Sequence, residues 1–175
     1  MKISVIMTVI GPDQPGLVEA LAAAVEKHQG NWEESRMSRL AGYFAGIVQV
    51  GLEDSQLGDL ERSIDALKQR GLQIVIVNEK GASAESAGGQ KISLEIVGQD
   101  QEGIVHRISK TLASHQINVE SFESTCEPAP WSGEILFRAI AELNCPESFE
   151  TDQLRADLEK IAADLMVDFS IHKSL

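Results

Sequence analysis

The sequence predicts an α+β protein made of two copies of one unit. Three observations support this. A segment of 24 residues recurs at a constant offset of 87, strand and helix periodicities follow in the same order in both halves, and a polar, Gly-rich stretch lies between them. Residues 11–34 and 98–121 share nine identities, including matched glycines, aspartates, histidines and asparagines. Identities of these types at one fixed offset indicate duplication.

The first unit begins with a strand, because a β-branched run fills 3–10 and Gly11-Pro12 ends it. A helix follows, with apolar residues and a histidine at helical spacing: Leu17, Leu21, Val25 and His28. Two strands are then expected at about 32–40 and 43–52. The spacing of Leu57, Leu60, Ile64 and Leu67 predicts a second helix, and the alternation of Leu72, Ile74 and Ile76 predicts a closing strand.

The second unit repeats this order. A strand is expected at 92–97, a helix carries Ile104, Ile108, Leu112 and His115, and two strands lie at about 118–127 and 133–143. The loop between these strands contains Pro128, Pro130 and Trp131, and Trp131 is either a partner anchor or packed on its own sheet. A second helix carries Leu154, Leu158, Ile161 and Leu165, with Thr151 or Asp152 as its expected N-cap. Val167, Phe169 and Ile171 mark the closing strand.

The order β-α-β-β-α-β, found twice, is that of the ferredoxin-like fold, an antiparallel four-stranded sheet with both helices on one face. We expect a first domain at 1–79, a linker at 80–90 and a second domain at 91–175, because 79–90 has the small, polar composition of a flexible linker. The edge strands of such sheets stay open to pairing, so a homodimer is plausible.

Charge restricts the class of partner. The 175 residues carry 15 Lys+Arg and 27 Asp+Glu, a formal net charge of −12. Proteins that bind nucleic acid or anionic membranes directly normally cluster basic side chains, and this sequence shows no such cluster. The sequence also has no long apolar run and no recognisable signal peptide, so we expect a soluble, cytoplasmic protein.

The most informative motif is the duplicated turn Gly-x-Asp-Gln-x-Gly between the first strand and the first helix. We expect Asp13 and Asp100 to cap the following helices, and Gly16 and Gly103 to permit close approach of a ligand or another backbone. The helix N-terminus that follows offers N–H groups and a partial positive charge to a small anion. A well-made βα turn with no ligand explains the same residues, and duplication alone does not separate the two interpretations.

These residues resemble the ACT domain, a small βαββαβ ligand-sensing module with an Asp-x-x-Gly turn and an Asn that opens the second strand. The matching positions are Asp13–Gly16 with Asn31, and Asp100–Gly103 with Asn118. Two such copies over nearly the whole chain resemble the glycine-cleavage-system transcriptional repressor family. That resemblance implies a regulator that binds an amino acid such as glycine and acts through a DNA-binding activator protein, without touching DNA itself.

The resemblance also implies a set of ligand-binding residues, all at the turn, the start of the first helix or the start of the second strand: Asp13, Gly16, Leu17, Asn31, Asp100, Gly103, Ile104 and Asn118. The second copy departs from the first, because Glu102 stands where the first has Pro15. The added carboxylate repels a carboxylate ligand and favours an ammonium group.

Catalytic and cofactor sites have little support in the sequence. His28 and His115 fall on the last turn of their helices, which favours a C-terminal capping role, and Cys126 has no matched base. No zinc, dinucleotide or NTP-binding motif is present, so we expect no enzyme activity, no metal and no cofactor. The alternative is an amino-acid-sensing regulatory subunit of a metabolic enzyme, because Gly11–Gly16 is similar to the N-terminus of formyltetrahydrofolate deformylases.

Overall fold

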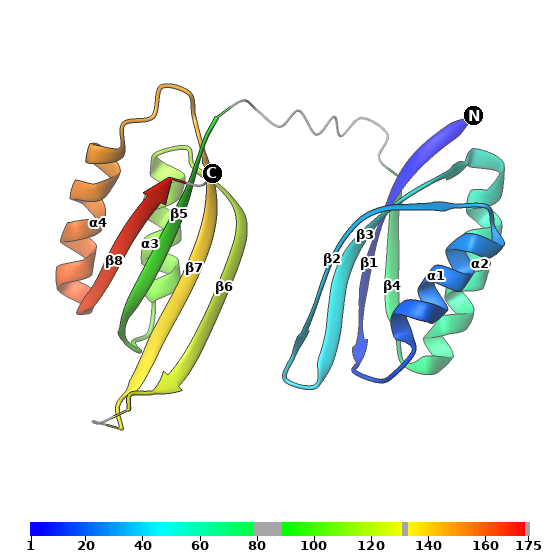
Figure 1. Cartoon of the computed structure of the whole chain (residues 1–175), viewed down its shortest axis with the longest axis horizontal. Coiled ribbons are helices and arrows are strands. Elements are labelled where there is room, and N and C mark those ends of the chain that lie inside the picture. Colours follow the sequence, from blue (N-terminus) through cyan, green and yellow to red (C-terminus); the bar gives the residue numbers. More distant parts are fainter. Residues whose placement is uncertain (79–88, 131–132, 174–175) are drawn as a thin grey trace. The chain divides into compact units, whose positions relative to one another are not determined.

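The computed structural model describes residues 1–78, 89–130 and 133–173 and confirms two units of the expected class. Each unit holds a four-stranded antiparallel sheet with two helices on one face of it (Figure 1). Trp131 and most of the expected linker at 80–90 lie outside the described residues, so their roles and the domain boundaries stay predictions. None of the helices in the described part of the chain is both long and apolar enough to cross a membrane.

The first unit has strand order β2-β3-β1-β4, with β1 antiparallel to both of its neighbours. Its strands are β1 (Lys2–Pro12), β2 (Asn31–Leu40), β3 (Tyr43–Glu53) and β4 (Gln73–Asn78). Its helices are α1 (Leu17–Lys27) and α2 (Leu57–Leu67), with short 3-10 turns at Asp54–Gln56 and Lys68–Arg70.

The second unit repeats this topology with strand order β6-β7-β5-β8. Its strands are β5 (Gln90–Gln99), β6 (Asn118–Pro128), β7 (Ile135–Cys145) and β8 (Val167–Lys173), and its helices are α3 (Ile104–Ser114) and α4 (Thr151–Leu165). A bulge interrupts the β2–β3 and β6–β7 pairings at equivalent places, between Trp32 and Glu34 and between Val119 and Ser121. The two units therefore share irregularities as well as their order of elements.

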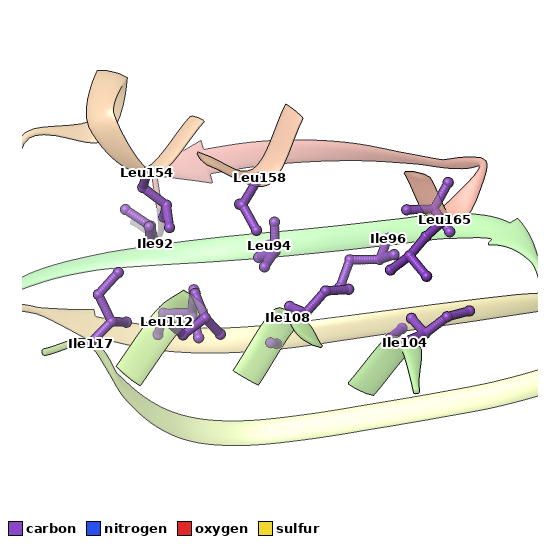
Figure 2. Close-up of a cluster of buried hydrophobic side chains, with 14 of the residues drawn as sticks. Ile92, Leu94, Ile96, Ile104, Ile108, Leu112, Ile117, Leu154, Leu158 and Leu165 are labelled. Carbon is purple, nitrogen blue, oxygen red and sulfur yellow. The ribbon is translucent and has the colours of Figure 1, made fainter. Parts of the chain in front are cut away.

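Each unit has its own core, formed between its helices and the alternate residues of its central strands. In the second unit, the side chains of Ile92, Leu94 and Ile96 point from β5 toward the helices (Figure 2). Leu94 lies in the middle of this row, between Leu158 of α4 and Ile108 of α3, and is fully buried. The period-2 alternation read from the sequence is the direct cause, because successive strand residues point to opposite faces.

The expected helix caps were wrong at three of the four helices. The N-caps of α1 and α3 are Gly16 and Gly103, and Glu150 precedes α4 in place of Thr151 or Asp152. Within the residues it describes, the structure shows no side-chain hydrogen bond that caps any of these helices. A glycine in the left-handed region, with φ of 83° at Gly16 and 87° at Gly103, turns the chain into the helix without a capping side chain.

One left-handed position differs between the units and gives a test of backbone strain. The left-handed residue that leads into the closing strand is Gly71 (φ 81°) in the first unit and Met166 (φ 50°) in the second, and Met166 is 64% exposed. We expect Met166→Gly to stabilise the second unit by about 0.5–1 kcal/mol, because glycine tolerates positive φ and the exposed methionine side chain contributes little packing. Urea unfolding measures the change; Gly71→Ala is the matched variant and should destabilise the first unit.

Candidate functional site: the duplicated strand–helix turn

In the first unit, the turn is held in place by contacts to the β2–β3 hairpin and to the short turn that follows the second helix. The backbone N–H of Asp13 donates to the carbonyl oxygen of Gly42 at 2.8 Å, which ties the turn to the β2–β3 hairpin. The Gln14 amide donates to the carbonyl oxygen of Arg70 at 2.7 Å, which ties it to the end of the second helix. The Asp13 carboxylate forms an ion pair with Arg39 at 2.7 Å.

The second unit reproduces the two backbone attachments. The N–H of Asp100 donates to the carbonyl oxygen of Ile135 at 2.9 Å, and the Gln101 amide donates to the carbonyl oxygen of Leu165 at 3.1 Å. The matched glutamines therefore attach the turn to the end of the second helix in both units. Their identity at the offset of 87 indicates that they matter, but the sequence does not show which group they bind.

The first glycine of the motif is also structural. A Cβ at Gly98 would lie 2.6 Å from Cα of Val167 and 2.7 Å from the carbonyl oxygen of Met166, and a Cβ at Gly11 would lie 2.9 Å from the carbonyl oxygen of Gly71. In both units the first strand passes so close to the start of the closing strand that a side chain does not fit. Part of the duplicated motif is thus required by packing alone.

The second glycine of the motif has open space beside it. At Gly103 a Cβ would meet nothing within 4 Å, and at Gly16 the nearest group is the Arg70 guanidinium, with Nη2 at 3.7 Å. Leu17 and Ile104, expected ligand-binding residues, are buried in their cores, so they offer a ligand their backbone and not their side chains. The arrangement at each turn is a helix N-terminus whose first N–H groups face an uncapped, open position.

The expected site residues do not all lie together within a unit. Asp13, Gly16 and Leu17 lie at one end of the first sheet, whereas Asn31 opens β2 beyond the other end of α1 and pairs with Gly51. An 11-residue helix spans about 16 Å, so Asn31 does not reach the turn. Asn118, which pairs with Asn144, is separated from Asp100 in the same way. Neither turn therefore brings the asparagine of its unit together with the aspartate and the glycine.

The two turns differ most in their charged neighbours. In the first unit the turn has guanidinium groups from Arg39 and Arg70 beside it. The equivalent positions in the second unit are Cys126, which lies opposite Phe137 as Arg39 lies opposite Phe44, and Leu165, whose carbonyl replaces that of Arg70. Neither arginine stands out in the sequence, because the repeat emphasises only residues that the two units share.

The matched histidines lie at the C-cap positions of α1 and α3, as expected, and each links its helix to the second helix of its unit. Nε2 of His28 lies 2.6 Å from Oγ of Ser63, and Nε2 of His115 lies 3.1 Å from Oδ2 of Asp157. Hydrogen bonds to Lys160 and His115 hold the pKa of Asp157 below its usual value. Among residues 1–78, 89–130 and 133–173, no group of three or more His, Cys, Asp or Glu side chains is arranged to hold a metal ion.

Cys126 occupies the position in the second unit that Arg39 has in the first, and its thiol can be used to test the electrostatics at the second turn. The pKa of the Cys126 thiol is raised above its usual value, chiefly by local desolvation. The negative charge of Asp100 and its hydrogen bond with the thiol raise it further. Asp100→Asn should lower that pKa, so the thiolate fraction at pH 8 rises and iodoacetamide modifies Cys126 several-fold faster. The midpoint of the rate–pH profile should move to lower pH.

The buried Cys145 should stay unmodified in the folded protein, so the reaction reports on Cys126. Asp152→Asn, a carboxylate removed from a helix start elsewhere in the unit, is the matched control and should leave the rate unchanged. An unchanged rate in Asp100→Asn as well would contradict the arrangement of Asp100 and Cys126.

Comparison with known proteins gives consistent matches. The model of the ACT domain family matches residues 4–77. A UPF0237 protein of Methanopyrus kandleri is 29% identical over 77 residues, which cover 42% of this chain and 86% of that protein.

Among solved structures, a protein of unknown function from Galdieria sulphuraria is similar over 100% of both chains, with a TM-score of 0.83 and 27% identity. A protein assigned as a glycine cleavage system transcriptional repressor is similar over 99% of both chains, with a TM-score of 0.74 and 16% identity, a level at which the likeness concerns the fold. Residues 4–77 therefore match the ACT domain family, and the second unit repeats the fold of the first.

Proposed function

We propose that this chain is a non-enzymatic regulator that senses a small amino acid, glycine being the first candidate, at the strand–helix turn of the first unit. The observation that carries the proposal is the open N-terminus of α1 at Gly16, with the Arg70 guanidinium beside it. A ligand carboxylate at this position would accept hydrogen bonds from backbone N–H groups and pair with a guanidinium.

The same turn supplies a group of the opposite charge. The Asp13 carboxylate, although paired with Arg39, lies three residues before Gly16 and attracts an ammonium group. A zwitterion of small size therefore suits the turn better than a simple anion. The left-handed Gly16 leaves space for a ligand close to the backbone, which favours an amino acid with a minimal side chain.

The second turn is a poorer carboxylate site. It keeps the open N-terminus of α3 at Gly103 but has Cys126 and Leu165 in place of the two arginines, and Glu102 adds a negative charge. We therefore propose that Asp100, Gly103 and Ile104 bind the amino acid weakly or bind a cationic amine instead. Asn31 and Asn118, at the other end of their units, are too far from the turns to contact a ligand bound there.

We propose that the chain controls transcription by binding a protein partner, a DNA-binding activator of glycine cleavage genes. We propose that it does so in the cytoplasm. Two observations support the proposed control of transcription. The full-length likeness in fold to a protein assigned as a glycine cleavage repressor is consistent with this class, and the net charge of −12 disfavours direct binding to nucleic acid.

Calorimetry of the full chain with glycine and each other amino acid tests the sensing part. Saturable binding is expected for glycine, and Arg70→Gln should weaken it by at least about tenfold, the usual effect of a lost charge-assisted hydrogen bond. Arg62→Gln is the matched control, because Arg62 lies in the same unit but pairs with Asp59 on α2. Absence of binding for every amino acid would overturn the proposal, and so would equal weakening in both variants.

Affinity capture with the tagged chain from its own cells tests the partner part. Recovery of a DNA-binding transcription factor, released or retained according to glycine concentration, is the expected result. Recovery of a metabolic enzyme in its place would favour a regulatory subunit instead. Direct binding of the purified chain to DNA at physiological salt would contradict the charge argument.

A further inference from the structure

A groove lies between α4 and β8, along the outer edge of the second sheet. In the described part of the chain, β8 is the last strand in the order β6-β7-β5-β8 and pairs only with β5. The groove has a volume of about 510 Å³, within the range of about 300–1,000 Å³ that holds small organic ligands. Its lining includes Glu159, Ala162 and Ala163 of α4 and Val167, Asp168 and Phe169 of β8. We call it the α4–β8 groove.

The inner wall of the α4–β8 groove is apolar. Val167 is buried, and Ala162 and Phe169 are partly buried against the core of the second unit. A narrower crevice shares these three residues and reaches Leu158 and Ile161, between α4 and the sheet. A ligand with a hydrocarbon body would remove the apolar surface of this wall from water, which stabilises a complex.

The charged residues of the lining, Glu159 and Asp168, are both acidic. Both are exposed, and among the residues that the structure describes neither takes part in an ion pair. Lys160, which follows Glu159, pairs instead with Asp157 at 2.9 Å. The carbonyl groups of the last turn of α4 add the negative end of the helix dipole. The α4–β8 groove therefore favours a cation and repels a carboxylate.

The first unit carries a cation of its own at the equivalent place. The histidine contacts described above align Ser63 of α2 with Asp157 of α4. Two residues further along each helix, Asp65 is therefore the equivalent of Glu159. Asp65 pairs with the ammonium group of Lys68 at 2.7 Å. In the second unit the residues three and four positions after Glu159 are alanines, so the carboxylate is kept but the ammonium group is lost.

The same replacement opens space. The second helix of the first unit ends in the 3-10 turn Lys68–Arg70, which consists of three residues with long side chains. In contrast, α4 continues as an α-helix to Leu165 and presents Ala162 and Ala163 to the groove. A methyl group leaves free the volume that a lysine or glutamine side chain would occupy. The second unit therefore has both the negative charge and the space for an ammonium group that comes from outside.

We propose that the α4–β8 groove binds a small organic cation, namely a primary amine with an apolar body and no carboxylate. Its ammonium group pairs with Glu159, in the role that Lys68 has in the first unit, and its body lies against Val167 and Phe169. This site is separate from the proposed amino-acid site at the first turn, whose ligand needs a carboxylate. The inference therefore does not depend on the proposed function.

Titration of the full chain with phenethylamine, followed by methyl NMR, tests the proposal. Saturable shifts of the Ala162 and Val167 methyl signals are expected, with a dissociation constant in the millimolar range, because an open groove buries only part of a small ligand. Phenethyl alcohol and phenylpropionate keep the apolar body and change its charge. The neutral alcohol should bind several-fold more weakly than the amine, and the anion should not bind.

Ala163→Lys tests the role of the internal cation. The new lysine stands four residues after Glu159, the favourable order for an ion pair on a helix, so its ammonium group competes with the ligand. The dissociation constant of phenethylamine, read from the Val167 methyl signals, should rise at least about fivefold. Ala113→Lys is the matched control, because Ala113 is also exposed on the last turn of a helix in the same unit and should leave binding unchanged. Circular dichroism checks that both variants fold.

Two carboxylate variants locate the amine. Glu159→Gln should weaken binding several-fold, whereas Asp100→Asn, at the second turn, should leave the groove signals unchanged. Loss of binding in Asp100→Asn without loss in Glu159→Gln would overturn the proposal. It would also be overturned by shifts that do not saturate at about 20 mM amine, by equal binding of the alcohol, or by equal weakening in Ala163→Lys and Ala113→Lys.

Discussion

Replacing Leu94 by alanine is expected to lower the free energy of unfolding of the second unit by about 3–5 kcal/mol, as large-to-small changes in fully packed cores do. Leu94 is fully buried in the middle of β5, with Leu158 and Ile108 of the two helices on either side of it (Figure 2). Truncation removes contacts to both helices at once. The backbone of β5 is paired on both edges, to β7 and β8, so it is poorly able to move and fill the cavity.

The effect should stay within one unit, because the buried residues form separate clusters in the two halves. Hydrogen–deuterium exchange should show faster exchange in the second unit alone, while urea unfolding gives the size of the loss. Ile140→Ala is the control on the opposite side of the same sheet, and its exposed side chain should cost less than about 1 kcal/mol. Equal losses from both substitutions would contradict the assignment of the core face.

The elements of the fold were predictable from the sequence for a physical reason. Buried residues repeat with the period of the element that carries them, so the spacing of Leu17, Leu21 and Val25 and the alternation of Ile92, Leu94 and Ile96 are read directly. The duplication at the offset of 87 supports the assignments of the first helices and the strand–helix turns. Residues of the second helices repeat with a different offset, and their apolar spacing alone was sufficient to find them.

The candidate site was less predictable, because its geometry depends on where distant segments meet. Asn31 was grouped with Asp13 by resemblance, yet α1 separates them. Asp13 was expected to cap α1, but its carboxylate reaches across to Arg39 on β2 and the glycine at position 16 makes the cap unnecessary. Nothing in the local sequence indicates that Arg70 stands beside Gly16, since the two meet only after the whole first unit has folded.

The duplicated motif therefore combines two kinds of requirement. Gly11 and Gln14, with Gly98 and Gln101, hold the turn against the closing strand and the end of the second helix in both units. The residues that differ, above all Arg39 and Arg70 against Cys126 and Leu165, are those that would distinguish the two turns for a ligand at the proposed site. The shared glycines and glutamines named above thus explain the fold of the turn, whereas the two arginines of the first unit bear on the proposed function.

Gly98→Ala is the sharpest test of the structural part of the motif and should destabilise the second unit by about 2–3 kcal/mol, the usual cost of overpacking. The added Cβ would meet Cα of Val167 at 2.6 Å and the carbonyl oxygen of Met166 at 2.7 Å. Both are backbone atoms, of Val167 in the β5–β8 pairing and of Met166 directly before it, so they are unable to rotate away as a side chain would. The conformation of Gly98 itself is not the cause, because the glycines with positive φ lie elsewhere.

Gly11→Ala gives an internal comparison in the first unit. One of its close contacts is the side chain of Leu72 at 2.8 Å, which has freedom to shift, so the loss should be smaller than for Gly98→Ala. Gly58→Ala is the control, because a Cβ there meets nothing within 4 Å and alanine stabilises a helix by about 0.5–1 kcal/mol relative to glycine. Urea unfolding should show the largest loss of stability for Gly98→Ala, a smaller loss for Gly11→Ala and no loss for Gly58→Ala. A Gly98→Ala chain as stable as the wild type would contradict the requirement for glycine in the packing of β5 against β8.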